Sequence, residues 1–310
     1  MRRAFLISAL AAASALSACG YGSATPQVNK GVTAKAAGSL GAKVAAVAAA
    51  GDIGCATPAS APGCRAADTA KLVERLKPSL VLALGDLSYE AGTAAEFSHG
   101  YAPTWGKFRS ITFPVPGNHE YNTDGAAGYK AWWGKAAMPQ GTTWHSRRLG
   151  NWLILGLDSN CGDVGGCGSG SAQGRWLSAQ LSSSPKCVLA IWHHPRRSSG
   201  PHGDNSSVQP LWQMLAKARA DLVLNGHDHD YERFAPLDSQ ANPTKVGMRE
   251  FVVGTGGKQP YPLVKSTPGS QASVQGVPGV LDLQLFTRGW SWRFVATSGS
   301  VEDSGSSACV

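Results

Sequence analysis

Five short apolar runs, each followed at once by a polar residue beside glycine or proline, constrain the fold of this chain most strongly. The runs are Val44–Ala50, Leu80–Leu84, Ile111–Val115, Val188–Trp192 and Leu222–Leu224. They lack a regular alternation of polar residues, which favours strands buried on both faces. Because open α/β sheets bind ligands at the carboxyl ends of their strands, the polar residues that follow are expected to converge on one rim of the sheet.

Helical segments are expected between several of these strands, at Ala67–Lys77, Gln173–Leu181 and Val208–Ala220. In the first of them the apolar residues recur at helical spacing, and Pro78 ends the helix. This alternation of strand and helix predicts a layered α/β domain. Trp144–Leu149 and Trp152–Leu157 are predicted to form a hairpin, and three later segments are predicted to be antiparallel strands: Arg249–Val253, Val280–Phe286 and Ser291–Thr297.

The N-terminal residues have the pattern of an export signal. Arg2 and Arg3 precede a short apolar segment that ends at Leu16-Ser17-Ala18-Cys19, which resembles a bacterial lipobox. That resemblance implies cleavage before Cys19 and a lipid on its sulfur, so the expected location is a bacterial membrane facing the periplasm or cell exterior. Secretion without a lipid is the alternative. We therefore expect a signal peptide at 1–19, a flexible tether at 20–43, one domain at 44–300 and a C-terminal tail at 301–310.

The cysteines are also consistent with export. Besides Cys19 there are six: Cys55, Cys64, Cys161, Cys167, Cys187 and Cys309. An even number in an oxidising compartment favours disulfides, although six cysteines allow 15 pairings. Proximity along the chain favours Cys55–Cys64 and Cys161–Cys167, which leaves Cys187 to pair with Cys309. A structural zinc site is the weaker interpretation, because no short spacing is C-x-x-C.

The charge of the chain favours anionic ligands without indicating a nucleic acid. The formal net charge is +8, and loss of Arg2 and Arg3 with the signal leaves about +6. No basic run is interleaved with aromatic residues, so nucleic-acid binding is not expected. The sequence does not indicate an oligomeric state.

The polar residues after the five strands have the chemistry of metal ligands. They include Asp52, Asp86, Tyr89, Asn118, His119, His193, His227 and His229. Each of them alone has a structural explanation, such as a turn or a buried polar side chain. Together, carboxylate, phenolate, amide and imidazole donors predict a metal centre that uses hard and borderline ligands.

The order of the motifs resembles a known family. Gly51-Asp52-Ile53-Gly54, Gly85-Asp86-Leu87-Ser88-Tyr89, Gly117-Asn118-His119-Glu120, His193-His194-Pro195 and Gly226-His227-Asp228-His229 are similar to the five-block signature of purple acid phosphatases, within the calcineurin-like metallophosphoesterases. The resemblance implies a four-layer α/β-β/α sandwich with mixed sheets and ligands on loops at strand ends. It also implies a short, single-domain bacterial type, because no segment before Val44 is long enough for the extra N-terminal domain of the plant enzymes.

The resemblance implies a role for each matching residue. Asp86 would bridge two metals, Asp52, Tyr89 and His229 would complete an Fe(III) site, and Asn118, His193 and His227 would complete a site for Zn, Mn or Fe(II). His119 would protonate the leaving group or hold a phosphate oxygen, and Glu120 would orient or tune His119. His202 would be a further catalytic residue, with an exposed loop histidine as the alternative.

The expected activity is hydrolysis of a small phosphate monoester by a water that two metals make acidic. A phosphodiesterase or nucleotidase with the same centre is the nearest alternative. A non-catalytic surface protein on this fold is a further one, although every ligand position is filled.

Overall fold

The computed structural model describes residues 40–55, 63–183 and 185–310. The signal sequence, Cys19 and most of the expected tether therefore lie outside the described residues.

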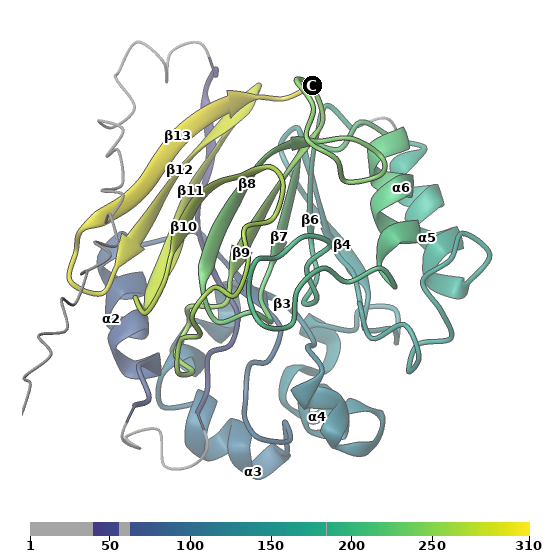
Figure 1. The fold of residues 1–310 in the computed structure, drawn as a ribbon. Coiled ribbons are helices and arrows are strands. Elements are labelled where there is room, and N and C mark those ends of the chain that lie inside the picture. The colour runs from purple at the N-terminus through teal and green to yellow at the C-terminus, as the bar shows by residue number, and fades with distance from the viewer. Residues whose placement is uncertain (1–39, 56–62, 184) are drawn as a thin grey trace, which may run out of the picture.

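Two sheets stack face to face at the centre of the molecule (Figure 1). The first has the order β13-β12-β11-β1-β2-β3, with bounds β1 (Lys43–Ala50), β2 (Leu80–Leu84), β3 (Thr112–Val115), β11 (Gly279–Phe286), β12 (Gly289–Ala296) and β13 (Val301–Ala308). The second has the order β10-β8-β9-β7-β6-β5-β4, with bounds β4 (His145–Leu149), β5 (Trp152–Gly156), β6 (Cys187–Ile191), β7 (Leu222–Asn225), β8 (Tyr231–Leu237), β9 (Met248–Val253) and β10 (Ser270–Val274).

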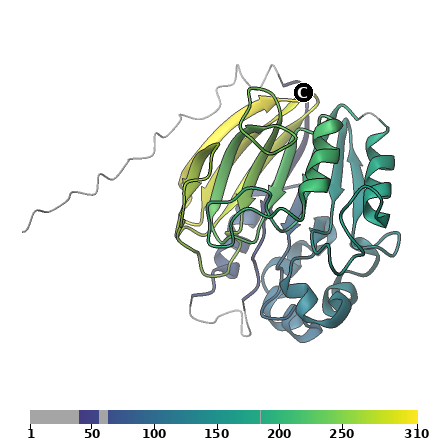
Figure 2. The same cartoon turned by 45° about the vertical axis from the view of Figure 1, so that its right-hand side comes forward.

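Helices cover the outer faces of this sandwich, as Figure 2 shows from a second side. The helix α2 (Ala66–Leu76) lies against the first sheet, and α5 (Ala172–Leu181) and α6 (Gln209–Lys217) lie against the second. The short helices α3 (Ala94–Glu96) and α4 (Ala127–Trp133) lie at the lower end of the molecule in Figure 1, among turns of π- or 3₁₀-helix at Phe97–Tyr101, Trp105–Ile111, His119–Asn122, Asp124–Ala126 and Gly134–Ala136. This arrangement is the expected four-layer α/β-β/α sandwich.

The core explains why the strands are apolar throughout. Successive residues of a strand point to opposite faces, so Ile154 of β5 packs between the two sheets while Leu153 and Leu155 pack under α5 and α6. The same alternation holds in β6, where Leu189 faces inward and Val188 outward. Both faces of the second sheet are therefore covered.

The strands that carry the polar motifs run parallel to one another. In the first sheet β1 pairs in parallel with β2, and β2 with β3; in the second, β5, β6 and β7 pair in parallel. Their carboxyl ends consequently meet at the same end of the molecule. The convergence expected on one rim thus takes place between the edges of two sheets.

Several elements differ from the sequence expectation. Arg249–Val253 lies within β9, which pairs antiparallel with β8 and also parallel with β7, so it is not a purely antiparallel strand. Val301–Ala308, expected as a tail, forms β13 and pairs antiparallel with β12. Its alternating, largely polar sequence suits an edge strand with one face in solvent, which composition alone does not distinguish from a loop.

All three expected disulfides are confirmed: Cys55–Cys64, Cys161–Cys167 and Cys187–Cys309. Three disulfides are compatible with an exported protein. Within the described residues, no helix has the length and apolar character needed to cross a bilayer.

Candidate metal centre

The ligands expected from the sequence come together at the shared end of the two sheets. Asp52, Asp86 and Asn118 follow β1, β2 and β3 of the first sheet, whereas His193 and His227 follow β6 and β7 of the second. Tyr89 and His229 lie a few residues further along two of these loops. The site is thus assembled by two sheets, each of which supplies its polar residues from parallel strand ends.

A first group of donors surrounds the hydroxyl of Tyr89. Its oxygen lies 2.8 Å from Asp52 Oδ1, 3.1 Å from Asp86 Oδ2 and 3.3 Å from His229 Nε2. His229 Nε2 is also 3.4 Å from Asp52 Oδ1. The phenol hydrogen can form a hydrogen bond to only one of these acceptors at a time. The lone pairs of the other acceptors therefore receive no hydrogen bond from Tyr89.

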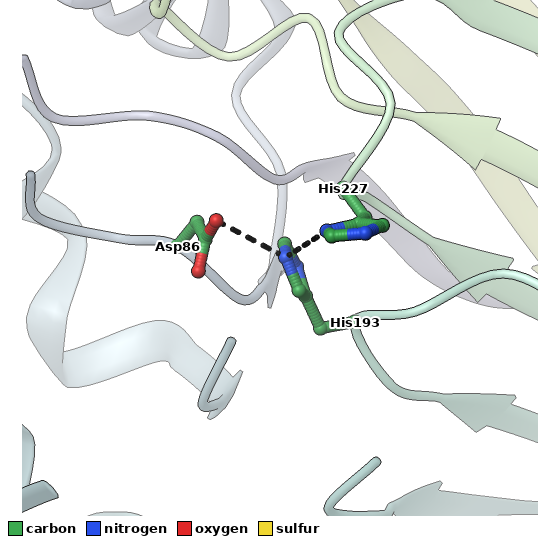
Figure 3. Close-up of side chains that lie close together, drawn as sticks. All are labelled: Asp86, His193 and His227. Atoms are coloured by element: carbon green, nitrogen blue, oxygen red, sulfur yellow. Dashed lines mark hydrogen bonds and ion pairs between the residues drawn. The ribbon is translucent and has the colours of Figure 1, made fainter. Parts of the chain in front are cut away.

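A second group surrounds His193 Nε2. This nitrogen lies 3.1 Å from Asp86 Oδ2, 3.1 Å from Asn118 Oδ1 and 3.2 Å from His227 Nδ1. Figure 3 shows Asp86, His193 and His227 directed toward one another. An amide oxygen and two imidazoles suit a borderline divalent metal ion.

Asp86 Oδ2 belongs to both groups, because the same oxygen contacts Tyr89 on one side and His193 on the other. Its other oxygen, Oδ1, accepts a hydrogen bond from the backbone N–H of His119 at 2.9 Å, which fixes the carboxylate plane. A carboxylate shared in this way is the arrangement expected of a bridging ligand between two metals.

Backbone carbonyls fix which nitrogen of two histidines faces the site. His193 Nδ1 lies 2.9 Å from the carbonyl of Leu84, and His229 Nδ1 lies 2.7 Å from the carbonyl of Gln259. A carbonyl only accepts hydrogen bonds, so each Nδ1 carries a proton and donates it. Nε2 of both rings is therefore left for a metal.

The local backbone is shaped for close approach. Asp52, Asp86 and His227 have positive φ values of 56°, 48° and 77°, which are unusual for residues with a side chain. The flanking glycines leave room for the ligands, because a Cβ on Gly85 would lie 2.6 Å from His193 Nδ1, and one on Gly117 would lie 2.1 Å from Asp86 Oδ1. Glycine at positions 85 and 117 is therefore a packing requirement.

Burial and neighbouring charges shift the pKa values of several residues in this site. Burial raises the pKa of Tyr89 well above its ordinary value, and the charges of Asp52 and Asp86 raise it further. Burial alone would raise the pKa of Asp86, but His193 and His119 outweigh burial and lower it. Burial would lower the pKa of His193, but Asp86 raises it to about 10. Burial would likewise lower the pKa of His229, but Asp52 raises it, so without a metal the buried carboxylates favour protons on the His193 and His229 rings.

These residues fit metal ions on their own chemistry. Two buried carboxylates and a phenol oxygen in mutual contact need compensating positive charge, which bound metal cations supply in place of protons. The first group offers hard oxygen donors that suit Fe(III), and the second suits Zn, Mn or Fe(II).

The comparisons with known proteins agree with this geometry. The family model described as calcineurin-like phosphoesterase matches residues 45–231. The chain belongs to that family. Its members use a dinuclear metal centre, and the resemblance to the purple acid phosphatases extends to individual relatives.

Three relatives illustrate the similarity. The chain is 28% identical over 204 residues to an uncharacterized protein, Rv2577, of Mycobacterium tuberculosis, covering 56% of this chain and 38% of that one. It is 26% identical over 197 residues to purple acid phosphatase 21 of Arabidopsis thaliana, covering 56% and 43%. The structure of purple acid phosphatase PPD1 from yellow lupin has a TM-score of 0.65 at 20% identity, covering 86% of this chain and 54% of that one. The chain thus spans less than half the length of the Mycobacterium tuberculosis and Arabidopsis thaliana relatives.

Two of the residues expected to be catalytic border the candidate ligands. His119 Nδ1 donates to the carbonyl of Glu90 at 2.6 Å, and its Nε2 lies 3.9 Å from Asp86 Oδ2. The His202 ring lies 4.3 Å from the ring of His227 between centroids, and the His202 backbone N–H donates to Asp228. Both side chains thus lie beside the metal ligands.

Glu120 has a different environment from the one expected. Its buried carboxylate accepts hydrogen bonds from four backbone N–H groups, those of Asp86, Leu87, Ser88 and Gly117, at 2.7–3.2 Å. It therefore holds together the loops after β2 and β3. The His119 ring hydrogen-bonds through Nδ1 to the Glu90 carbonyl rather than to the Glu120 carboxylate.

Sequence reasoning missed the segment Lys258–Tyr261, which packs on the Tyr89 side of the centre. The Lys258 backbone N–H donates to the Asp52 carbonyl, and its ammonium lies 4.2 Å from the centroid of the Tyr89 ring. The Tyr261 ring stacks on His229 at 4.0 Å between centroids. The apolar end of β9 followed by Gly254-Thr255-Gly256-Gly257 was the available signal, because it repeats the pattern of a strand that ends in glycine.

Proposed function

We propose that this phosphoesterase hydrolyses phosphate monoesters, using Fe(III) and a divalent ion (Zn, Mn or Fe) as purple acid phosphatases do. The observation that carries the proposal is the position of Tyr89, whose hydroxyl contacts Asp52, Asp86 and His229 at once. A phenol in a buried, anionic pocket ionises only when a strongly acidic cation binds it. This requirement favours Fe(III) at that position.

The residues of the chain divide the reaction between them. When bound, the two metals neutralise phosphate charge and acidify a water that attacks phosphorus. His119 donates from Nδ1 to the Glu90 carbonyl, so the doubly protonated ring also carries a proton on Nε2, which it would pass to the departing alcohol oxygen. Asn118, His193 and His227 form one side of the centre and His202 lies next to them, where a phosphate oxygen would be held.

The substrate class is tested by comparing turnover of a monoester and a matched diester, such as para-nitrophenyl phosphate and bis-para-nitrophenyl phosphate. The proposal expects the monoester to be preferred. A diester that is turned over much faster would replace the monoesterase assignment with a phosphodiesterase that uses the same residues.

The metal assignment is tested by the visible absorption spectrum of the purified, mildly oxidised protein. We expect a broad phenolate-to-iron band in the green to yellow region, and we expect it to vanish in Tyr89→Phe. Phosphatase turnover without this band in the wild-type protein would retain the hydrolase and reject the purple-type metal pair.

We further propose that the protein is exported and anchored by a lipid on Cys19. The three disulfides support export, and the lipobox-like sequence supports the anchor. Intact protein should partition into the detergent phase, and Cys19→Ser should move it to the aqueous phase. Equal partitioning of the two proteins would reject the anchor.

A further inference from the structure

His194 is a histidine at the metal centre that has no ligand role. It follows the ligand His193, and its ring lies 4.5 Å from the ring of His227 between centroids. The opposite neighbour of His227 is the His202 ring at 4.3 Å. Whereas His193 is fully buried, His194 is partly exposed to solvent.

The buried hydroxyl of Ser159 holds the His194 ring. Ser159 Oγ accepts the His194 backbone N–H at 3.1 Å and lies 2.8 Å from His194 Nδ1. The residues on both sides of Ser159 are also held by hydrogen bonds. The Asp158 carboxylate accepts hydrogen bonds from the hydroxyls of Tyr121 and Thr143. The Asn160 side chain donates to the Gly117 carbonyl. The ring is therefore oriented before any substrate arrives.

Hydrogen counting assigns the proton of the ring. Ser159 is 3% exposed, and His194 Nδ1 is the acceptor found for its hydroxyl hydrogen among the described residues. Leaving that hydrogen unsatisfied would carry the desolvation cost of a buried donor, so the hydroxyl donates to Nδ1. A neutral ring then carries its proton on Nε2, and a charged ring carries one there as well.

We propose that His194 Nε2–H donates a hydrogen bond to a phosphate oxygen of the substrate, which makes His194 a substrate-binding residue positioned by Ser159. This inference rests on the proposed function. Its ligand is the tetrahedral phosphate dianion, which spans the two donor groups and presents an oxygen toward the His227 side. The geometry supplies a donor there without adding a metal ligand.

The test uses the metal-loaded protein and inorganic phosphate as the probe, measured by titration calorimetry together with KM and kcat. His194→Asn keeps an acceptor near the position of Nδ1 for Ser159 but removes the Nε2 donor. His194→Gln places an amide N–H near the position of Nε2. His99→Asn, at an exposed histidine, is the matched control.

We expect His194→Asn to weaken phosphate binding and raise KM about tenfold, the effect of one charge-assisted hydrogen bond, with unchanged metal content and Tm. His194→Gln should restore binding to within about threefold of wild type. Phosphate binding by His194→Asn equal to that of His99→Asn would overturn the proposal. So would loss of bound metal in both His194 variants, which would make His194 structural. Wild-type protein that binds phosphate but hydrolyses no ester would reject the proposed function and leave the His194 comparison intact.

Discussion

At the residue scale, the metal centre depends on groups that do not touch a metal. Backbone carbonyls fix the His193 and His229 rings, a backbone N–H fixes Asp86, and four backbone N–H groups converge on Glu120. These three candidate ligands are thus held by hydrogen bonds away from the metal side, which lowers the cost of organising the site when a metal binds. Two single substitutions test this support.

Replacing Glu120 with alanine removes the acceptor of four backbone N–H groups in the loops after β2 and β3. Burial, and then the charge of Asp86, raises the pKa of Glu120 to about 8, although the hydrogen bonds from the Gly117 and Ser88 backbone oppose the rise. We expect Glu120→Ala to lower the free energy of unfolding by about 3–5 kcal/mol and to reduce bound metal. Urea unfolding and metal analysis measure both. If Glu120 acts through His119 instead, turnover falls while stability and metal content stay unchanged.

Adding one methyl group at Gly117 tests the close packing around Asp86. A Cβ there would lie 2.1 Å from Asp86 Oδ1 and 2.4 Å from its backbone nitrogen, so Asp86 must move. We expect Gly117→Ala to lose at least about 90% of phosphatase turnover together with bound metal. Gly162→Ala is the control, because nothing lies within 4 Å of its Cβ. Full metal loading of Gly117→Ala would contradict the requirement for glycine.

At the element scale, the strands that position ligands are joined by buried polar side chains at their other ends. Asp221 precedes β7, and its carboxylate accepts from the N–H of Val188 in β6 and from the N–H of Val310. One carboxylate thus holds β6, β7 and the C-terminus in register. Its burial gives this element a pH dependence that is independent of the metal centre.

Burial raises the pKa of Asp221 to about 6, from 3.8 in the unfolded chain. The folded state therefore holds the proton more tightly, so this group stabilises the fold most below pH 4. That contribution is lost as the pH rises from about 4 to 6 and is constant above. In the wild-type protein, Asp221 should therefore lower the free energy of unfolding by about 2–3 kcal/mol as the pH rises through that window. We expect Asp221→Asn to lack this decrease. Urea unfolding at pH 4, 5, 6 and 7 checks this, with the exposed Asp163→Asn as control. The same pH profile in wild type and Asp221→Asn would contradict it.

At the scale of the whole molecule, the metal centre depends on how the two sheets are joined. The first sheet supplies the carboxylates and Asn118, and the second supplies the histidines, so a shift between the sheets would separate the two donor groups. The disulfide Cys187–Cys309 links the start of β6 in the second sheet to the residue after β13 in the first. It is a covalent connection between the layers that build the site.

Removing this disulfide should cost more stability than removing a local one. The half-cystines are 122 residues apart, whereas Cys161 and Cys167 are 6 apart. Loop-closure entropy predicts a loss of about 4–5 kcal/mol for Cys187→Ser/Cys309→Ser and about 2 kcal/mol for Cys161→Ser/Cys167→Ser. Denaturant unfolding of the two double variants measures the difference. Equal losses would show that the long-range link adds nothing beyond the packing of the sheets.

The sequence by itself predicted the candidate ligand set, because Asp52, Asp86, Asn118 and His227 each follow a short apolar run and stand beside a glycine. Such patterns can be read from neighbouring residues, because a buried strand must be apolar and the chain must turn where the strand ends. The same locality identified α2, α5, α6 and the three disulfides. It did not identify β13, whose polar edge sequence lacks the apolar signal of a central strand.

Only the tertiary structure decided how these pieces share one centre. The division of the ligands between two sheets and the shared position of Asp86 Oδ2 arise from sheet stacking, which no local pattern encodes. The support of Asp86 by Glu120, the packing of Lys258 and Tyr261 on the centre, and the orientation of His194 by Ser159 join residues from 32 to 206 positions apart. Contacts of that range form only when the layers pack together, so no local stretch of sequence encodes them.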